Sequence, residues 1–124
     1  MLNDNEIPLC YMDNEQNSAG IAYRVSQLPM AVLVNENSYS AAEFFAAALR
    51  EYDAATVVGA QTTGKNRSQT NMILVDGSAV HISNKRYLTP NRVDLTEQGG
   101  LTPDIQLANV ENDAQLEAAL GLFN

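Results

Sequence analysis

The chain has 124 residues, 45% of them hydrophobic, which suits one domain or part of a larger one. It carries 15 acidic against 7 basic residues, a net charge of −8, and the basic residues do not cluster beyond positions 84–86, so a phosphate-binding surface and a nucleic-acid partner are not expected. No apolar run reaches the roughly 18 residues of a membrane-spanning helix, and no charged-then-apolar leader is present, so we expect neither a membrane span nor an export signal in this chain.

The first predicted elements are two strands, at 7–12 and 20–25, joined by the polar turn 13–17. A two-stranded ribbon is only marginally stable alone, so this hairpin is expected to pack on the rest of the chain. Cys10 lies in the first strand. As the only cysteine it excludes an internal disulfide and a thiolate metal site, and its apolar neighbours predict an ordinary buried thiol.

The central stretch of the sequence reads as a buried strand at 30–34, a polar elbow at 35–39 and a helix over 40–53. The helix is predicted from one apolar stripe on a 3.6-residue period, made of Ala41, Phe44, Phe45, Ala48, Leu49 and Tyr52. Ser40 therefore lies where a strand has ended and a helix begins.

Two interpretations of Ser40 are open at this point. An elbow of this kind lifts a hydroxyl above the end of a sheet, and the unpaired N–H groups of the first helical turn favour negative charge beside it, which suits a nucleophile. Ser40 followed by Glu43 also fits the capping box, in which both side chains only satisfy helix-end donors. The spacing alone favours the cap, because every helix needs one and few need a nucleophile.

The remaining elements follow in order. A short β-branched strand at 54–59 completes a right-handed βαβ unit, and a loop covers 61–68. Strands at 69–75 and 79–87 form a hairpin around Asp76-Gly77. Turns are expected at 89–91 and 99–104, and an amphipathic helix capped by Asp113 covers 113–122.

Lys65 and Gln69 are the candidates that would act with Ser40. The loops that leave the carboxyl ends of two parallel strands lie on one side of a sheet, so Ser40 and Lys65 are expected on the same rim. A lysine whose pKa is lowered by burial is a plausible base for a serine, and Gln69 could hold its amine without adding a charge. The alternatives are a solvated loop lysine and an outward-facing strand glutamine.

Two other kinds of site are disfavoured. His81, the only histidine, lies in an alternating strand, where a surface histidine is favoured over a catalytic one, so a Ser-His-Asp protease is not expected. The segment 59–65, GAQTTGK, partly matches a nucleotide-binding loop. However, Asn66 replaces the hydroxyl residue that would bind magnesium, and a strand follows where a helix should begin, so this interpretation is rejected.

Four segments together resemble the C-terminal processing (tail-specific) proteases, serine endopeptidases that use a Ser-Lys dyad. They read NENSYSAAE, VVGAQTTGKNRSQ, RYLTPNR and GLTPD, in the family's order, and the resemblance runs from about residue 20 to the end. It implies Ser40 as nucleophile, Lys65 as general base, Gln69 as the residue that positions the lysine and the Ala41 N–H as an oxyanion donor. No metal or cofactor is implied.

The chain departs from the family pattern at several points. Asn66 stands where glycine usually follows the lysine, and Tyr39 and Ala42 replace small and hydroxyl residues of the elbow. The family's domain is also longer. Its PDZ module and a Gly-rich segment that supplies a second oxyanion donor are expected upstream of Met1, which would make the isolated chain a poor peptidase.

The resemblance also implies a fold and a setting. The fold is α/β, a partial Clp protease/crotonase-like core, with residues 1–28 as an N-terminal β-hairpin region and 29–124 as the catalytic core, without a PDZ module. The implied partner is a protein or peptide with an apolar carboxyl end, in the cell envelope or another extracytoplasmic place. We also expect homo-oligomers, because apolar surface around 30–34 and the Phe44/Phe45 face would otherwise meet water. The alternative is a non-catalytic binding or assembly module on the same scaffold.

Overall fold

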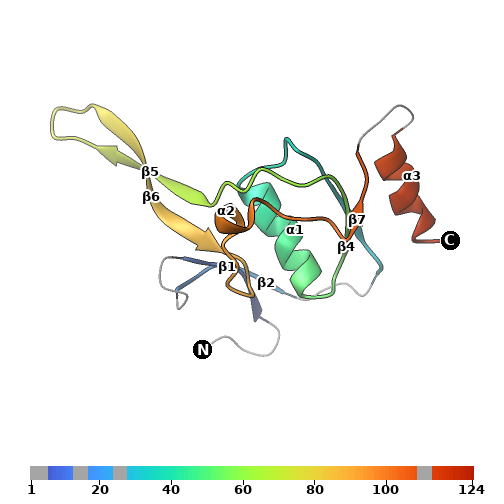
Figure 1. Cartoon of the computed structure of the whole chain (residues 1–124). Coiled ribbons are helices and arrows are strands. Elements are labelled where there is room, and N and C mark those ends of the chain that lie inside the picture. The colour runs from blue at the N-terminus through green and yellow to red at the C-terminus, as the bar shows by residue number, and fades with distance from the viewer. Residues whose placement is uncertain (1–5, 13–16, 24–27, 109–112) are drawn as a thin grey trace.

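The computed structural model of the chain describes residues 6–12, 17–23, 28–108 and 113–124, with side chains described from residue 28 onward (Figure 1). Within these residues the structure contains both sheets and helices, so the predicted α/β class is confirmed. The elements are β1 (Glu6–Met12), β2 (Asn17–Tyr23), β3 (Ala31–Val34), α1 (Ala41–Glu51), β4 (Thr56–Gly59), β5 (Arg67–Ile73), β6 (Ala79–Leu88), α2 (Leu95–Gln98), β7 (Ile105–Gln106) and α3 (Ala114–Gly121).

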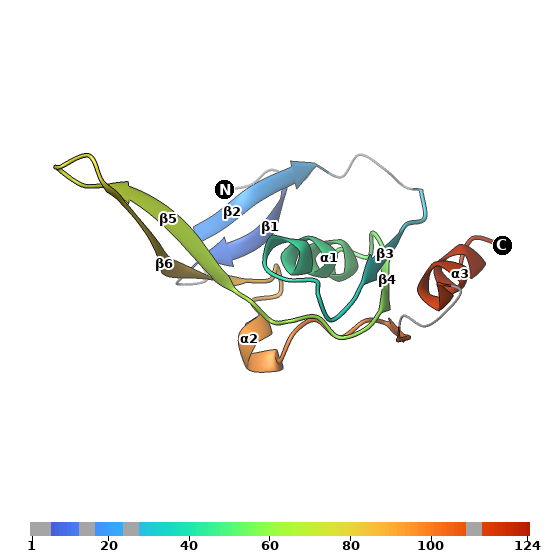
Figure 2. The same ribbon diagram turned by 90° about the horizontal axis from the view of Figure 1, so that it is seen from above.

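A parallel sheet in the order β3-β4-β7 forms the centre of the molecule. Val32 pairs with Val57 and Val34 with Gly59, so the predicted strand, helix, strand unit is confirmed. The sheet lies between α1 on one side and α3 on the other (Figures 1 and 2). Because β3 and β4 run parallel, their carboxyl ends lie at the same end of the sheet, and the loops that follow them are neighbours.

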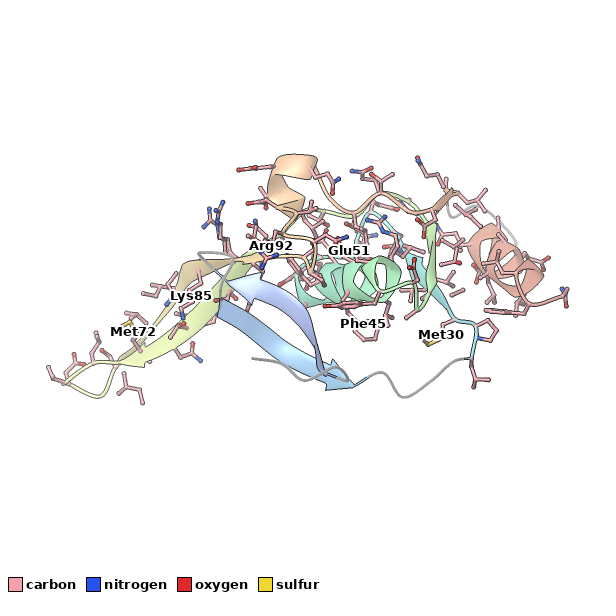
Figure 3. The ribbon with its side chains drawn as sticks, turned by 90° about the horizontal axis from the view of Figure 1, so that it is seen from below. Met30, Phe45, Glu51, Met72, Lys85 and Arg92 are labelled. Atoms are coloured by element: carbon pink, nitrogen blue, oxygen red, sulfur yellow. The ribbon has the colours of Figure 1, made fainter. Side chains whose placement is uncertain are left out.

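The predicted apolar stripe of α1 is only partly right. Phe44 is buried, and the centroid of its ring lies 5.6 Å from that of the Tyr87 ring. Phe45, in contrast, is 55% exposed and projects from the flank of the helix (Figure 3). Ala46 and Ala47, outside the stripe, are fully buried. The difference arises because α1 contacts β3 and β4 on one side and β1 on another, so small alanines are needed on more than one face.

The hydrophobic core gathers around α1 and β4. Its buried residues come from five segments that are far apart in the sequence, and they are Val34, Phe44, Ala46, Ala47, Val57, Leu95 and Leu101. Val32, Tyr87 and Val93 pack against this cluster. The core therefore joins α2 and the segment around Leu101 to the unit formed by β3, α1 and β4.

A second, antiparallel sheet has the order β2-β1-β6-β5. Both predicted hairpins are confirmed, with shifted bounds: β2 already includes Asn17, which was expected in a turn, and β5 begins at Arg67 inside the expected loop. The β5–β6 hairpin projects away from the core as an arm (Figure 2). At its tip Asp76 accepts hydrogen bonds from the Ser78 hydroxyl at 2.6 Å and the Ser78 N–H at 3.0 Å, and these hold the pKa of Asp76 below its usual value.

Two short elements were not predicted. Asp94 caps α2 by accepting hydrogen bonds from Thr96 N–H at 2.9 Å and Glu97 N–H at 3.2 Å, and β7 pairs with β4 through Ile105 and Val58. The predicted helix at 113–122 is confirmed as α3, capped by Asp113 as expected. The burial predicted for the Cys10 thiol and the predicted turn residues 13–16 lie outside the described residues. Among the described helices none has the length and apolarity needed to cross a membrane.

Candidate active site

Ser40 lies on a strained turn between β3 and α1. The elbow is held by short-range hydrogen bonds, from Ser38 N–H to the Asn35 carbonyl at 2.9 Å and from Asn35 N–H to the Ser38 hydroxyl at 3.0 Å. Immediately after it the Ser40 backbone has φ 58° and ψ −125°, a conformation that a residue with a side chain rarely adopts. Such strain costs about 1–3 kcal/mol and persists only where the surrounding structure enforces it, as at functional sites.

This strain gives a prediction for stability. Ser40→Gly should raise the free energy of unfolding by about 1 kcal/mol relative to Ser40→Ala, because glycine adopts positive φ freely and is also the better helix N-cap. Urea unfolding of the two variants, neither of which has a hydroxyl, measures the difference. Equal stability of the two variants would show that the Ser40 backbone is not strained in solution.

The N-terminal end of α1 presents donors next to Ser40. The Ser40 N–H donates to Glu43 Oε2 at 2.7 Å and the Glu43 N–H faces the Ser40 side chain, so both halves of the capping box that the sequence predicted are present. The Glu43 N–H donates to the Ser40 backbone carbonyl at 3.0 Å. Within the described residues the Ala41 N–H has no recorded acceptor, so it is open to an oxygen at the mouth of the elbow.

The loop that carries Lys65 lies against the Ser40 elbow. Thr63 joins the two loops, because its N–H and its hydroxyl both donate to the Ser38 carbonyl, at 3.1 and 2.9 Å. The N–H groups of Gly64 and Lys65 donate to Glu43 at 2.6 and 2.9 Å. The two loops that were expected on one rim are thus side by side and hydrogen bonded to each other.

The side chains of the candidate residues are not yet engaged with one another. The Lys65 amine lies 5.5 Å from the centroid of the Tyr39 ring. Among the described residues no hydrogen bond joins this amine to the Ser40 hydroxyl or to Gln69. Gln69 is exposed on β5, just after an irregularity between Ser68 and Gln69 in the pairing with β6. The structure therefore brings the backbones of Ser40 and Lys65 together, and the roles of the three side chains stay predictions.

Glu43 is the residue of this region that sequence reasoning undervalued. Its side chain is fully buried, and besides the Ser40 N–H it accepts hydrogen bonds from the hydroxyl of Thr62 and from the N–H groups of Gly64 and Lys65. Thr62 is itself buried and accepts the Leu101 N–H at 2.7 Å. The available signal was the S-x-x-E spacing, which predicts a bond within α1 and not the bonds to a loop some twenty residues later.

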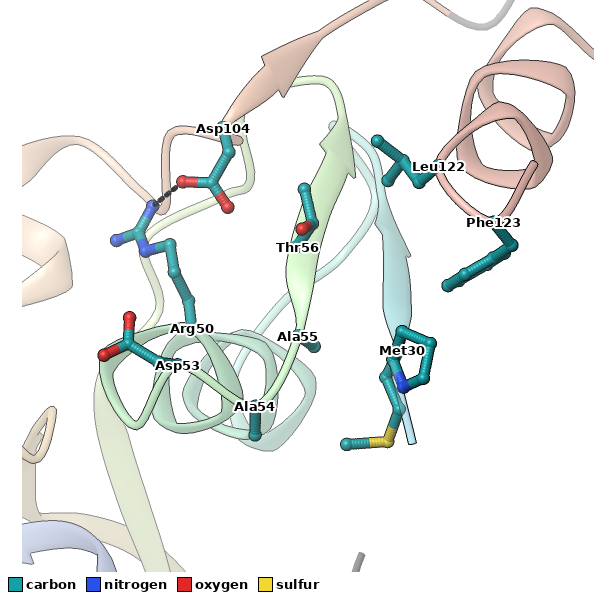
Figure 4. Close-up of a pocket in the computed structure, with 10 residues that line it drawn as sticks. Met30, Arg50, Asp53, Ala54, Ala55, Thr56, Asp104, Leu122 and Phe123 are labelled. Atoms are coloured by element: carbon teal, nitrogen blue, oxygen red, sulfur yellow. Dashed lines mark ion pairs between the residues drawn. The ribbon is translucent and has the colours of Figure 1, made fainter. Parts of the chain in front are cut away.

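A pocket of about 510 Å³ lies at the other end of the sheet, where β3 and β4 begin. Met30, Ala54 and Thr56, which line it, are at the beginnings of β3 and β4, whereas Ser40 and Lys65 follow the ends of these strands (Figure 4). Arg50 and Asp104, also in the lining, are 4.0 Å apart. The pocket is therefore separate from the candidate active site.

His81 has the surface role that was favoured. It is exposed on β6, and its Nδ1 contacts the Asn71 side chain of β5 across the hairpin. In the described parts of the chain no group of three or more histidine, cysteine, aspartate or glutamate side chains is arranged to hold a metal ion.

Comparisons with known proteins agree with the sequence motifs. Residues 5–107 match peptidase family S41. The chain is 40% identical over 84 residues to carboxyl-terminal-processing peptidase 3 of Arabidopsis thaliana chloroplasts, which covers 68% of this chain and 16% of that protein. It is 36% identical over 104 residues to a carboxyl-terminal-processing protease of Synechocystis, covering 77% of this chain and 24% of that protein.

Solved structures agree as well. The chain superposes on a photosystem II D1 C-terminal processing protease with a TM-score of 0.70 and 34% identity, covering 84% of this chain and 28% of that one. A putative peptidase from Parabacteroides merdae gives 0.69 with 25% identity, covering 96% and 43%. The chain thus spans less than half of these proteins. The match over residues 5–107 includes the Ser40 elbow, the Lys65 loop and all of the parallel sheet. The chain belongs to peptidase family S41.

Proposed function

We propose that this chain carries the Ser-Lys catalytic residues of a serine endopeptidase that cleaves proteins near their carboxyl ends. Ser40 is the nucleophile, Lys65 is the general base, Gln69 positions the lysine amine and the Ala41 N–H is an oxyanion donor. The observation that carries the proposal is the backbone of Ser40. A serine at a strained strand-to-helix turn, with positive φ and an open N–H on the next residue, is the arrangement by which other hydrolases expose a nucleophile.

The reaction proceeds through an acyl-enzyme. The neutral Lys65 amine takes the proton of the Ser40 hydroxyl as Oγ bonds to the substrate carbonyl carbon, and the carbonyl electron pair moves to oxygen beside the Ala41 N–H. When the intermediate collapses, the C–N bond breaks and the Lys65 ammonium returns its proton to the leaving amine. Water, deprotonated by Lys65, then attacks the ester and releases Ser40.

Lys65 must change its contact for this reaction. Its amine now lies 5.5 Å from the centroid of the Tyr39 ring, in a cation–π contact. A rotation of the lysine side chain toward Ser40 is required, and catalytic hydrogen bonds are often loose before substrate binds. The same contact is the observation that favours the alternative, a non-catalytic module, in which Lys65 is a surface lysine held by Tyr39.

The substrate and the setting are part of the proposal. The similarity to carboxyl-terminal-processing peptidases and proteases supports cleavage near a carboxyl terminus, and we propose an apolar carboxyl end as the recognised feature. The chloroplastic and bacterial relatives support an extracytoplasmic or envelope location. Self-association is supported by apolar side chains that face water, since Leu33 is 43% and Phe45 55% exposed.

A fluorophosphonate probe tests the function without a known substrate. The probe should attach to one serine, Ser40, located by mass spectrometry of peptides, and Ser40→Ala should remove the label completely. Heat-unfolded protein is the control for unselective reaction. A protein that incorporates no label at Ser40 after prolonged incubation would favour the non-catalytic module. A peptide with an apolar carboxyl end, compared with the same peptide ending in a charged residue, then tests the proposed substrate.

A further inference from the structure

The Glu43 carboxylate connects the backbones of the two proposed catalytic residues. Its Oε2 accepts the Ser40 N–H at 2.7 Å and the Lys65 N–H at 2.9 Å, so a single oxygen atom bridges residue 40 and residue 65. Its Oε1 accepts the Gly64 N–H at 2.6 Å and the Thr62 hydroxyl. All four partners donate, so both oxygens of the Glu43 side chain act as acceptors.

These bonds link segments 35–40 and 60–66, which lie outside the helices and strands. Outside them, the recorded hydrogen bonds between the elbow and the Lys65 loop within the described residues come from Thr63, whose side chain is exposed. The Glu43 side chain is instead completely buried, and hydrogen bonds in the interior of a protein are electrostatically stronger than those exposed to water. Glu43 therefore determines how the Lys65 backbone sits relative to the Ser40 backbone.

We infer that Glu43 is a positioning residue of the Ser-Lys site: it sets the separation and direction of the Ser40 and Lys65 side chains by holding both backbones on one buried carboxylate. The inference rests on the proposed function. It assigns Glu43 no contact with the substrate and no proton transfer. Its effect is on alignment, and a misplacement of a catalytic group by about 1 Å can lower a rate by about 10²-fold.

Glu43→Gln is the sharpest variant, because it keeps size and shape. An amide replaces one oxygen with an NH₂ group, so either the Ser40 and Lys65 N–H groups or the Gly64 N–H and Thr62 hydroxyl would face a donor. We expect full occupancy of Ser40 by the fluorophosphonate at long times, with a labelling rate constant lower by about 10²-fold. For peptide cleavage kcat should fall by a similar factor, with KM nearly unchanged.

The fraction of molecules labelled at Ser40 distinguishes a misaligned site from a loss of folded protein. A variant that is partly unfolded labels a smaller fraction of molecules at the original rate, whereas a misaligned site labels all molecules slowly. Gln115→Met is the matched control. Gln115 is also buried and polar, and it donates to the Leu107 carbonyl at 2.7 Å from α3, on the other side of the sheet from α1, so its replacement should lower stability and leave the rate constant unchanged.

Thr62→Val gives the same comparison if Glu43→Gln does not fold. It removes one of the four donors to Glu43, and with it the acceptor of the Leu101 N–H, while keeping the Glu43 side chain and the shape of residue 62, and the expected loss in rate constant is roughly tenfold. If the unchanged protein, Glu43→Gln and Thr62→Val were all labelled at Ser40 with equal rate constants, the positioning role of Glu43 would be overturned and the proposed function would stand. Absence of label at Ser40 in the unchanged protein would instead overturn the proposed function, and the role of Glu43 with it.

Discussion

Lys65→Ala is expected to lower the rate constants of fluorophosphonate labelling and of peptide cleavage by about 10⁴-fold, because it removes the amine proposed to take the Ser40 proton. The fold should be nearly unaffected. Lys65 is exposed, and the contact recorded for its amine in the described part of the chain is the Tyr39 ring. Such an exposed contact contributes about 0.5–1 kcal/mol, so the melting temperature should change by no more than about 4 °C.

A pH profile tests whether Lys65 is the base. Only a neutral amine can accept the serine proton, so the rate constant of the unchanged protein should rise with pH, and this rise should be absent in Lys65→Ala. Small primary amines added to Lys65→Ala should restore part of the rate. Lys85, the other lysine of the chain, lies on β6, and Lys85→Ala is the control that keeps both the rate and its pH dependence. A Lys65→Ala protein with near-normal rates would show that another group is the base.

The elements predicted with the strongest local patterns are the ones that the structure contains. A β-branched run on each side of an amphipathic helix was enough to predict β3, α1 and β4, and Asp76-Gly77 was enough to predict the β5–β6 hairpin. Asp113 predicted the beginning of α3. In each case the decisive interactions are between residues close in sequence, or the pairing follows from the handedness of a βαβ unit.

The elements that were missed depend on distant residues. β7 has two residues, and its partner Val58 is far away in the sequence, so no periodic pattern can indicate it. α2 has four residues, which is too short for an apolar period, although Asp94 followed by Glu97 matches a capping signature that could have indicated it. The burial of Ala46 and Ala47 follows from the sheets packed around α1 and not from the helix itself.

In the candidate site, too, the features set by local sequence were predicted, and those set by distant residues were not. The order of strand, elbow and helix predicted that Ser40 and Lys65 would follow neighbouring strand ends, and their loops do lie together. The sequence did not predict that Glu43 would join these loops, because a capping residue and a buried bridge have the same spacing. Nor did it predict that the Lys65 amine would lie against Tyr39, a residue noted only as a departure from the family pattern.

Gly59→Ala is expected to be strongly destabilising. Gly59 ends β4 with φ 138°, and a Cβ atom there would lie 1.8 Å from the Val34 carbonyl oxygen. The clash is with the backbone of the neighbouring strand, which cannot move without breaking the bond from Ala60 N–H to that same oxygen, at 3.0 Å. We expect a loss of at least about 4 kcal/mol and a fall in melting temperature of about 15 °C or more.

Alanine substitutions at two other glycines distinguish the cost of the steric clash at residue 59 from the cost of backbone strain. Gly77 also has positive φ, 82°, but a Cβ there would have no atom within 4 Å, so Gly77→Ala should cost only about 1 kcal/mol, the strain alone. Gly121 has neither positive φ nor a close neighbour, and Gly121→Ala at the end of α3 should be neutral or slightly stabilising. Thermal unfolding of the three variants checks the order. If Gly59→Ala and Gly77→Ala were equally stable, the close approach of β4 to the Val34 carbonyl would not exist in solution, and the loops that carry Ser40 and Lys65 would leave the sheet further apart.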